Sequence, residues 1–215
     1  TMKNWTISRR VIAGFATMLL IIVALGVFAL WRLMGLAQNV SDLADSSLPS
    51  VLLLNEASKV SRGNLIDLLQ IDETGSSERN ATHEQRIGAN TVRRDELLKS
   101  YEERGLIADD EDRRLFKEVQ RAKEIMTASR THAIELAHEG KAEESRQVQQ
   151  ETVIPDYDKY LKAIDLTVDY KAKLGQTTAD AGKASALFSV RLIGAALGLA
   201  LLLTIVLAWQ VIRST

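Results

Sequence analysis

Two long apolar runs lie near the ends of the chain. Residues 11–31 and 192–212 contain no charged side chain. Each run has about 21 residues, which as an α-helix would extend about 31 Å and match the hydrocarbon core of a bilayer. We therefore expect two transmembrane helices. A cleaved signal peptide is the alternative for residues 11–31, but the run is long for one and no clean small-x-small cleavage site follows it.

Between these runs, apolar residues recur every three or four positions, which is the spacing of amphipathic helices. The pattern predicts four helices: residues 32–72, residues 76 or 77 to 104, the acidic ADDEDRR cluster to about 138, and about 151 to the second apolar run. The remaining stretch, GKAEESRQVQQ, is expected to form a short helix or cap at the membrane-distal end. The predicted fold is all-α, an antiparallel up-down-up-down four-helix bundle continuous with two transmembrane helices.

Glycines and polar residues mark the expected helix ends. Gly75, Gly105 and Gly140 are predicted stops, and Ser76 or Ser77 is a predicted N-terminal cap. The acidic cluster before the third helix suits a positive helix N-terminus. Proline occurs only twice in the chain, and the second one fits the first turn of the descending helix.

Each predicted helix carries an apolar face. The inward positions of the first are Leu33, Leu36, Val40, Leu43, Leu54, Ala57, Ser61, Leu65 and Leu68. Those of the third are Leu115, Val119, Ala122, Met126, Ser129, Ala133 and Leu136, and those of the fourth are Tyr157, Leu161, Ile164 and Val168. Lower on the fourth helix stand the small residues Gly175, Thr178, Gly182 and Ser185, which permit either sliding or close packing.

Charge separates the middle of the chain from its ends. All 28 acidic residues and 23 of the 27 basic ones lie in residues 32–191, so this segment has a net charge of −5. Lys3, Arg9 and Arg10 precede the first apolar run, and the positive-inside rule then places the N-terminus in the cytoplasm. Trp5, Trp31 and Trp209 lie at or near the expected membrane boundaries, where tryptophan is favoured. The chain has no cysteine, so it holds no disulfide framework.

These observations predict five segments. They are a cytoplasmic N-terminus (1–10), a first transmembrane helix (11–31), a periplasmic sensor domain (32–191), a second transmembrane helix (192–212) and the start of a cytoplasmic linker (213–215). The expected location is the bacterial inner membrane, with two spans.

The order of SRRVIAGFATMLL, SSLPSVLLLNEASKV and IPDYDKYLKAIDLTVDYKAKL resembles the sensory half of a bacterial methyl-accepting chemotaxis receptor with a four-helix-bundle ligand-binding domain. The resemblance covers essentially the whole chain. It implies a homodimer that continues after the second span into a HAMP linker and a cytoplasmic hairpin controlling a histidine kinase with its adaptor. VIRST looks like the first residues of that linker, so we expect the transmitter to be missing from this chain.

Candidate ligand contacts come from basic and aromatic residues at one expected height of the bundle. The resemblance implies a carboxylate clamp of arginines on the first helix, of which only Arg62 falls at a comparable position. By height, Arg130, Tyr157 and Tyr160 lie near the same layer. Arginine pairs bidentately with carboxylates and tyrosine adds a ring and a hydroxyl, so these four residues favour a small organic acid or amino acid. A solvated arginine on a charged helix is the alternative for Arg62 and Arg130.

Other chemistry is weakly indicated. His132 and His138 are six residues apart and point away from one another, so no metal site is expected. The charged run 93–96 is interpreted as a solvated face. GAALG at Gly194 to Gly198 can bring membrane helices together. Catalytic motifs and phosphate loops are not recognised, and neither enzyme activity, a cofactor nor nucleic-acid binding is expected.

The predicted function is that of a transmembrane chemoreceptor input module. It would sense a small extracytoplasmic ligand and pass a displacement of the fourth helix across the membrane. Two alternatives stay open: the input module of a sensor histidine kinase or cyclic-dinucleotide enzyme, and a ligand-free structural bundle tethered to the membrane. Sequence leaves open whether a ligand site lies within one subunit or between two.

Overall fold

The computed structural model describes residues 7–71 and 77–213, and within them every regular element is a helix. The elements are α1 (Ile7–Asp42), η2 (Leu43–Ser47), α2 (Leu48–Leu69), α3 (Ser77–Glu103), α4 (Asp110–His138), α5 (Ala142–Val148), η3 (Gln149–Val153) and α6 (Ile154–Arg213). They form two compact units. The bundle unit comprises Asp42–Gln176, and the second unit comprises the described parts of Thr1–Ser41 and Thr177–Thr215.

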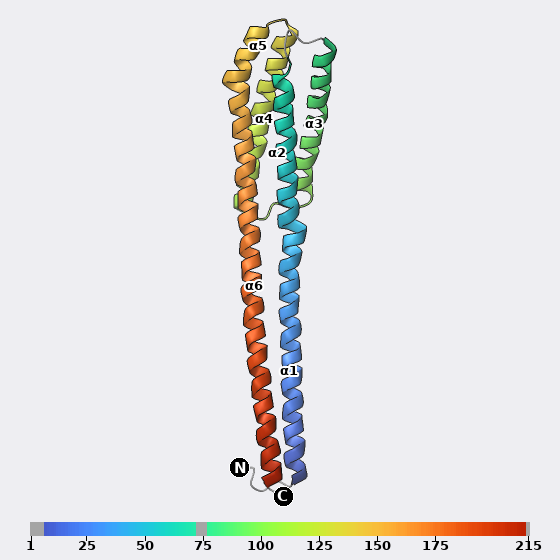
Figure 1. The fold of residues 1–215 in the computed structure, drawn as a ribbon, viewed down its shortest axis with the longest axis vertical. Coiled ribbons are helices and arrows are strands. Elements are labelled where there is room, and N and C mark those ends of the chain that lie inside the picture. Colours follow the sequence, from blue (N-terminus) through green and yellow to red (C-terminus); the bar gives the residue numbers. More distant parts are fainter. Residues whose placement is uncertain (1–6, 72–76, 214–215) are drawn as a thin grey trace. The chain divides into compact units, whose positions relative to one another are not determined.

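The bundle unit is an antiparallel four-helix bundle, as the sequence predicts. Figure 1 shows α2, α3, α4 and the first part of α6 side by side, with α5 at the end where α4 leads back into α6. One hydrophobic core runs through these helices and includes Leu54, Leu68, Leu98, Val119, Met126 and Ile164, each almost fully buried. Burial of these side chains supplies the main driving force for packing the four helices together.

The ends of α3 and α4 confirm the glycine stops. Gly105 and Gly140 have φ of 65° and 74°, a left-handed conformation that glycine adopts without penalty. Each belongs to a Schellman motif, in which the next residue's N–H reaches back to Tyr101 or Leu136. At the start of α4 the carboxylate of Asp109 accepts the Asp112 N–H at 2.9 Å, which caps the helix. The predicted roles of Gly75 and Ser76, and of Trp5, lie outside the described residues.

Two π-helical turns, which sequence reasoning missed, stand directly before the two prolines. The N–H of Leu48 bonds to the Leu43 carbonyl, and that of Ile154 to the Gln149 carbonyl, each five residues back. Proline has no N–H and its ring crowds the carbonyl four residues earlier. A widened turn before Pro49 and before Pro155 relieves that crowding. The helical path therefore continues past both prolines, and Pro155 occupies the first turn of α6 as predicted.

The apolar faces agree with expectation only in part. Leu54, Ala57 and Leu68 are buried on α2, whereas Leu33, Leu36 and Val40 on α1 are exposed, contrary to prediction. The π-helical turn at residues 43–47 shifts the helical phase between these two groups, so one continuous stripe does not persist. On α4 the buried side chains include Phe116 and Arg130 rather than Leu115 and Ser129.

The second unit pairs α1 with the last part of α6. The Arg32 guanidinium donates to the Ser189 hydroxyl at 2.8 Å and to the Ser185 carbonyl at 3.2 Å. A Cβ added at Gly182 would lie 3.3 Å from the Asn39 side-chain nitrogen, so this glycine permits close packing. Helical runs that include α1 and α6 each contain an unburied window with mean hydropathy of 2.4 or 2.2, long and apolar enough to cross a membrane.

Candidate functional site

A layer of polar side chains lies inside the bundle unit, where an apolar core would be the usual arrangement. Several of its atoms are buried without a hydrogen-bond partner in the described part of the protein. They are Asn64 Oδ1, Arg94 Nη1, Thr127 Oγ1, Arg130 Nε and Nη1, Tyr157 Oη and Tyr160 Oη. Each unmet buried group costs about 1–3 kcal/mol, and charged groups cost more. This arginine layer, defined as Arg94, Arg130, Tyr157 and Tyr160, is therefore destabilising by itself.

Arg130 is the least compensated member of the arginine layer. Its side chain comes from the buried face of α4, one turn beyond Met126, and only 5% of the residue is exposed. It forms no ion pair with a carboxylate of the described residues, and two of its three guanidinium nitrogens have no partner. Because arginine stays protonated at all ordinary pH values, a positive charge remains in the core. Such a site favours an anion.

Other buried charges in the bundle are paired, which sets Arg130 apart. Asp67 on α2 contacts Arg86 at 2.7 Å and His83 at 2.9 Å. Asp112 on α4 contacts Lys171 of α6 at 2.6 Å, and neither side chain is exposed. Buried charges in proteins are usually paired, because moving an unpaired charge out of water costs free energy. An unpaired buried guanidinium in the same bundle therefore calls for a functional explanation.

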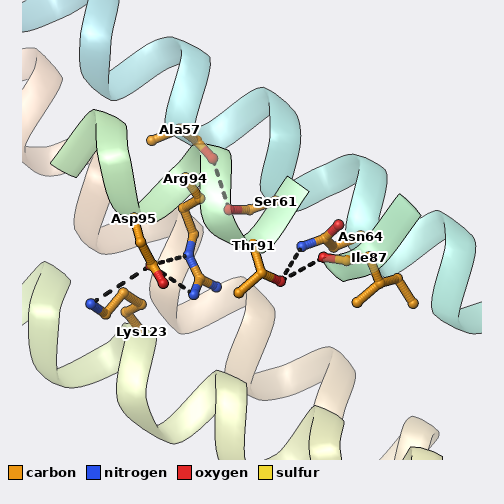
Figure 2. A network of polar contacts seen from close by, with 8 residues as sticks. All are labelled: Ala57, Ser61, Asn64, Ile87, Thr91, Arg94, Asp95 and Lys123. Atoms are coloured by element: carbon orange, nitrogen blue, oxygen red, sulfur yellow. Dashed lines mark hydrogen bonds and ion pairs between the residues drawn. The ribbon is translucent and has the colours of Figure 1, made fainter. Parts of the chain in front are cut away.

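Arg94 brings a second positive charge into the interior from α3. It is 1% exposed, and its Nε and Nη2 donate to Asp95 at 3.0 and 2.9 Å, while Nη1 has no partner within residues 7–71 and 77–213. Figure 2 shows this guanidinium between α2 and α4, with Asp95 also facing Lys123. The Lys123 ammonium lies 3.8 Å from Asp95. One carboxylate is thus shared by two cations.

Polar residues of α2 lie beside Arg94 where α2 packs against α3. The Asn64 amide donates to Thr91 at 3.3 Å, and Thr91 donates to the Ile87 carbonyl at 2.6 Å (Figure 2). Ser61 uses its hydroxyl to bond the Ala57 carbonyl at 2.7 Å. Ser61 and Thr91 are thus held by their own helices, and the Asn64 bond joins α2 to α3 beside Arg94.

Tyr157 and Tyr160, on the first turns of α6, are neutral and buried. Burial raises the pKa of Tyr160 to about 12, although the nearby Ser61 hydroxyl and Arg94 charge act in the opposite direction. Burial likewise raises the pKa of Tyr157, and the charges of Arg130 and Arg94 oppose it. The Tyr157 hydroxyl lies near Arg130, yet in the described part of the chain it has no hydrogen-bond partner of ordinary geometry. Both phenols therefore keep a proton that can be donated to an anion.

The predicted site residues separate into two groups. Arg130, Tyr157 and Tyr160 are buried in the bundle, and electrostatic effects link Arg130 to Tyr157 and Tyr157 to Tyr160. Arg62 has an exposed side chain on α2 and does not join them within one chain.

Sequence reasoning missed Arg94, which was interpreted as part of a solvated face and is instead buried. The sequence did contain a signal for the burial of Arg94. Arg94 lies seven residues after Ile87 and seven before Tyr101, both buried on the same face of α3. The charged neighbours Arg93 and Glu96 are exposed, as expected.

Near the other end of the bundle, a second polar cluster is fully satisfied. Asp112 accepts from the Tyr101 hydroxyl at 2.7 Å and from the Ala108 N–H at 2.8 Å, in addition to pairing with Lys171. Lys171 also donates to the Leu106 carbonyl. This cluster ties α6 to the turn between α3 and α4, and its satisfied groups indicate a structural role.

Metal chemistry finds no support in the described residues, because none of their His, Asp and Glu side chains gather in a group of three suited to a metal ion. In the second unit, Gly194 and Gly198 have no neighbour within 4 Å of an added Cβ. Among the described residues, no neighbouring helix therefore approaches these two glycines closely.

The described part of the chain thus combines an antiparallel four-helix bundle with two helices long and apolar enough to cross a membrane. The family model described as "Four helix bundle sensory module for signal transduction" matches residues 4–186, so the chain belongs to this family, the sensory module of methyl-accepting chemotaxis proteins. The family predicted from the sequence is thus confirmed. A comparison with curated proteins finds none that matches.

Proposed function

We propose that the chain is the input module of a transmembrane chemoreceptor and that it senses a small carboxylate in the periplasm. The observation that carries the ligand class is Arg130, a buried cation without an anionic partner among the described residues. A carboxylate would accept from its free guanidinium nitrogens and from the hydroxyls of Tyr157 and Tyr160. Family membership supports the sensory role.

The proposed topology rests on the two apolar runs and the charges beside them. Residues 1–10 and 213–215 are assigned to the cytoplasm, residues 11–31 and 192–212 to the bilayer, and residues 32–191 to the periplasm. The flanking lysine and arginines before the first run support this orientation. The proposed cellular partners are the cytoplasmic kinase and adaptor that serve receptors of this family.

A homodimer is supported by one exposed face of α2. Leu48, Leu52, Ile66 and Leu69 are 48–60% exposed, and helical phase places them on one side of the helix together with Arg62. This face has an apolar patch at each end, separated by the exposed Asn55, Lys59 and Arg62, and exposed apolar patches are typical of surfaces that contact another protein. Arg62 is therefore assigned to the dimer seam, where it would meet a ligand only if the site extends across two subunits.

The signalling mechanism follows from the closed state of the arginine layer. Arg94, Arg130, Tyr157 and Tyr160 are each at most 5% exposed, so the helices must separate for a ligand to enter. An acid that binds the separated arrangement more tightly shifts the population towards it. Since α6 carries both tyrosines and continues to Arg213, a change in its packing is proposed to be the output.

A thermal-shift screen of the full chain in detergent against organic acids and amino acids tests this function. A bound acid at about one hundred times its Kd should stabilise the protein by about 2.7 kcal/mol. Arg130→Met should abolish the shift, whereas Arg121→Met, an exposed arginine on the same helix, should preserve it. No shift with any acid would contradict carboxylate sensing. Arg62→Ala should keep the thermal shift if the site lies inside one bundle. The variant should lose the shift if the site is shared between two subunits.

A further inference from the structure

We infer that the arginine layer selects a dianion, with Arg130 binding one acid group and Arg94, within the same chain, binding the other. The inference rests on the proposed function, because it names the ligand class and the second clamp of that same interior site. Arg94 and Arg130 come from different helices, and both keep a buried Nη1 with no partner among the residues that the structure describes.

The charge balance of the layer exceeds what one carboxylate can neutralise. Arg94, Lys123 and Arg130 bring three positive charges, and Asp95 is the carboxylate that contacts two of them. The Asp95 side chain is itself 47% exposed, so solvent screens much of its charge. Asp156, beside Tyr157 on α6, is paired with Lys159 at 3.1 Å. Two positive charges thus remain in excess in this network.

Arg94 and Arg130 come from positions that are offset along the bundle. Asp95 contacts Lys123, so Arg94 belongs near the level of Lys123 on α4. Arg130 follows Lys123 by seven residues, which is two helical turns on one face and about 10 Å of rise. This stagger provides two anion positions, one towards each guanidinium. A short diacid aligned with the bundle axis could reach both, with the phenols of Tyr157 and Tyr160 beside it.

Selection against monoacids follows from the cost of leaving Arg94 Nη1 without an acceptor, because Asp95 binds only the other two nitrogens of that guanidinium. A monocarboxylate bound to Arg130 leaves Nη1 of Arg94 buried and without an acceptor. Sites built to bond two groups discriminate strongly against ligands that lack one of them, because the unmatched protein group stays desolvated. The diacid should therefore gain affinity from its second carboxylate and not merely from its greater charge.

Calorimetric titration of the full chain in lipid nanodiscs, with acids matched in carbon skeleton, tests the inference. The pairs are succinate with butyrate and terephthalate with benzoate, at neutral pH. We expect at least one diacid to bind about tenfold tighter or more than its matched monoacid. Arg94→Met should reduce the diacid to the affinity of the monoacid, and Arg130→Met should abolish both.

Two further variants separate charge from folding. Arg94→Lys keeps a positive charge and should preserve the diacid preference at reduced affinity. Arg93→Met removes the adjacent arginine, whose side chain is 57% exposed, and should change neither affinity. Equal affinities for diacid and monoacid, or a preference that survives Arg94→Met, would overturn the dianion inference. The proposed carboxylate sensing would then still stand if Arg130→Met abolished binding. Failure of all four acids to bind would overturn the inference, and the broader acid screen would decide the proposed function separately.

Discussion

At the scale of single residues, Arg130 and Arg94 illustrate a conflict between stability and binding. A guanidinium in a protein core loses its hydration, and only an anion or a full set of acceptors compensates for that loss. Asp67 and Asp112 have such compensation, whereas Arg130 does not. Residues that destabilise the free protein and bind a ligand are expected at functional sites.

Arg130→Met is expected to stabilise the ligand-free chain. Methionine fills much of the same volume and removes two unpartnered guanidinium nitrogens, so the free energy of unfolding should rise by about 1–3 kcal/mol. Chemical denaturation of the full chain in detergent measures this change, with Arg121→Met as the exposed control. A loss of stability in Arg130→Met would mean that the guanidinium supports the bundle, and it would contradict a site kept for a ligand.

The pKa of Tyr160 gives a prediction for alkaline pH. In the folded chain this pKa is about 12, compared with an ordinary value of 10.0, so the unfolded chain releases the proton first. Its contribution to stability is therefore complete below pH 10 and declines as the pH rises towards 12. Tyr160→Phe should lose less stability than the wild type between about pH 9 and pH 11. Chemical denaturation at about pH 9 and about pH 11 measures this loss for both proteins. An equal fall in the free energy of unfolding for the wild type and the variant would contradict the burial of this phenol.

At the scale of helices, the periodicity of apolar residues predicted the four bundle helices and the glycine stops at Gly105 and Gly140. Those features depend on local patterns, which a sequence displays directly. The π-helical turns before Pro49 and Pro155 were not predicted, because their geometry depends on a helix that continues on both sides of the proline.

The candidate site was predictable only in part. Arg130, Tyr157 and Tyr160 followed from counting helical heights, and the structure buries all three. Arg94 was missed because three charged neighbours concealed its place on the apolar face of α3. The partnership of Lys171 with Asp112 joins residues 59 positions apart, and no local pattern indicates such a contact.

Lys171 should matter more for stability than for ligand recognition. Its ion pair with Asp112 is completely buried, and it holds α6 against the turn between α3 and α4. Lys171→Met leaves Asp112 without its counter-ion and should cost about 3–5 kcal/mol. Lys162→Met, at an exposed position on α6, should change stability by less than about 0.5 kcal/mol. Denaturant unfolding compares the two variants, and similar small losses would contradict the structural role of this pair.

At the scale of the whole molecule, the proposed signalling mechanism requires that binding in the bundle unit changes how α6 packs against α1 in the second unit. One residue pair there is suited to detect such a change. An added Cβ at Gly182 would lie 3.7 Å from the Asn39 Cβ, which is within the range for a disulfide. The chain has no cysteine of its own, so a double variant would contain a single possible intramolecular pair.

The most direct measurement is therefore the rate of disulfide formation in the Asn39→Cys, Gly182→Cys variant in native membranes, with and without saturating succinate or another acid that stabilises the chain. We predict that the acid changes the rate, and that adding Arg130→Met abolishes the change while leaving the basal rate intact. A rate that stays the same when the acid is bound would contradict transmission through α6.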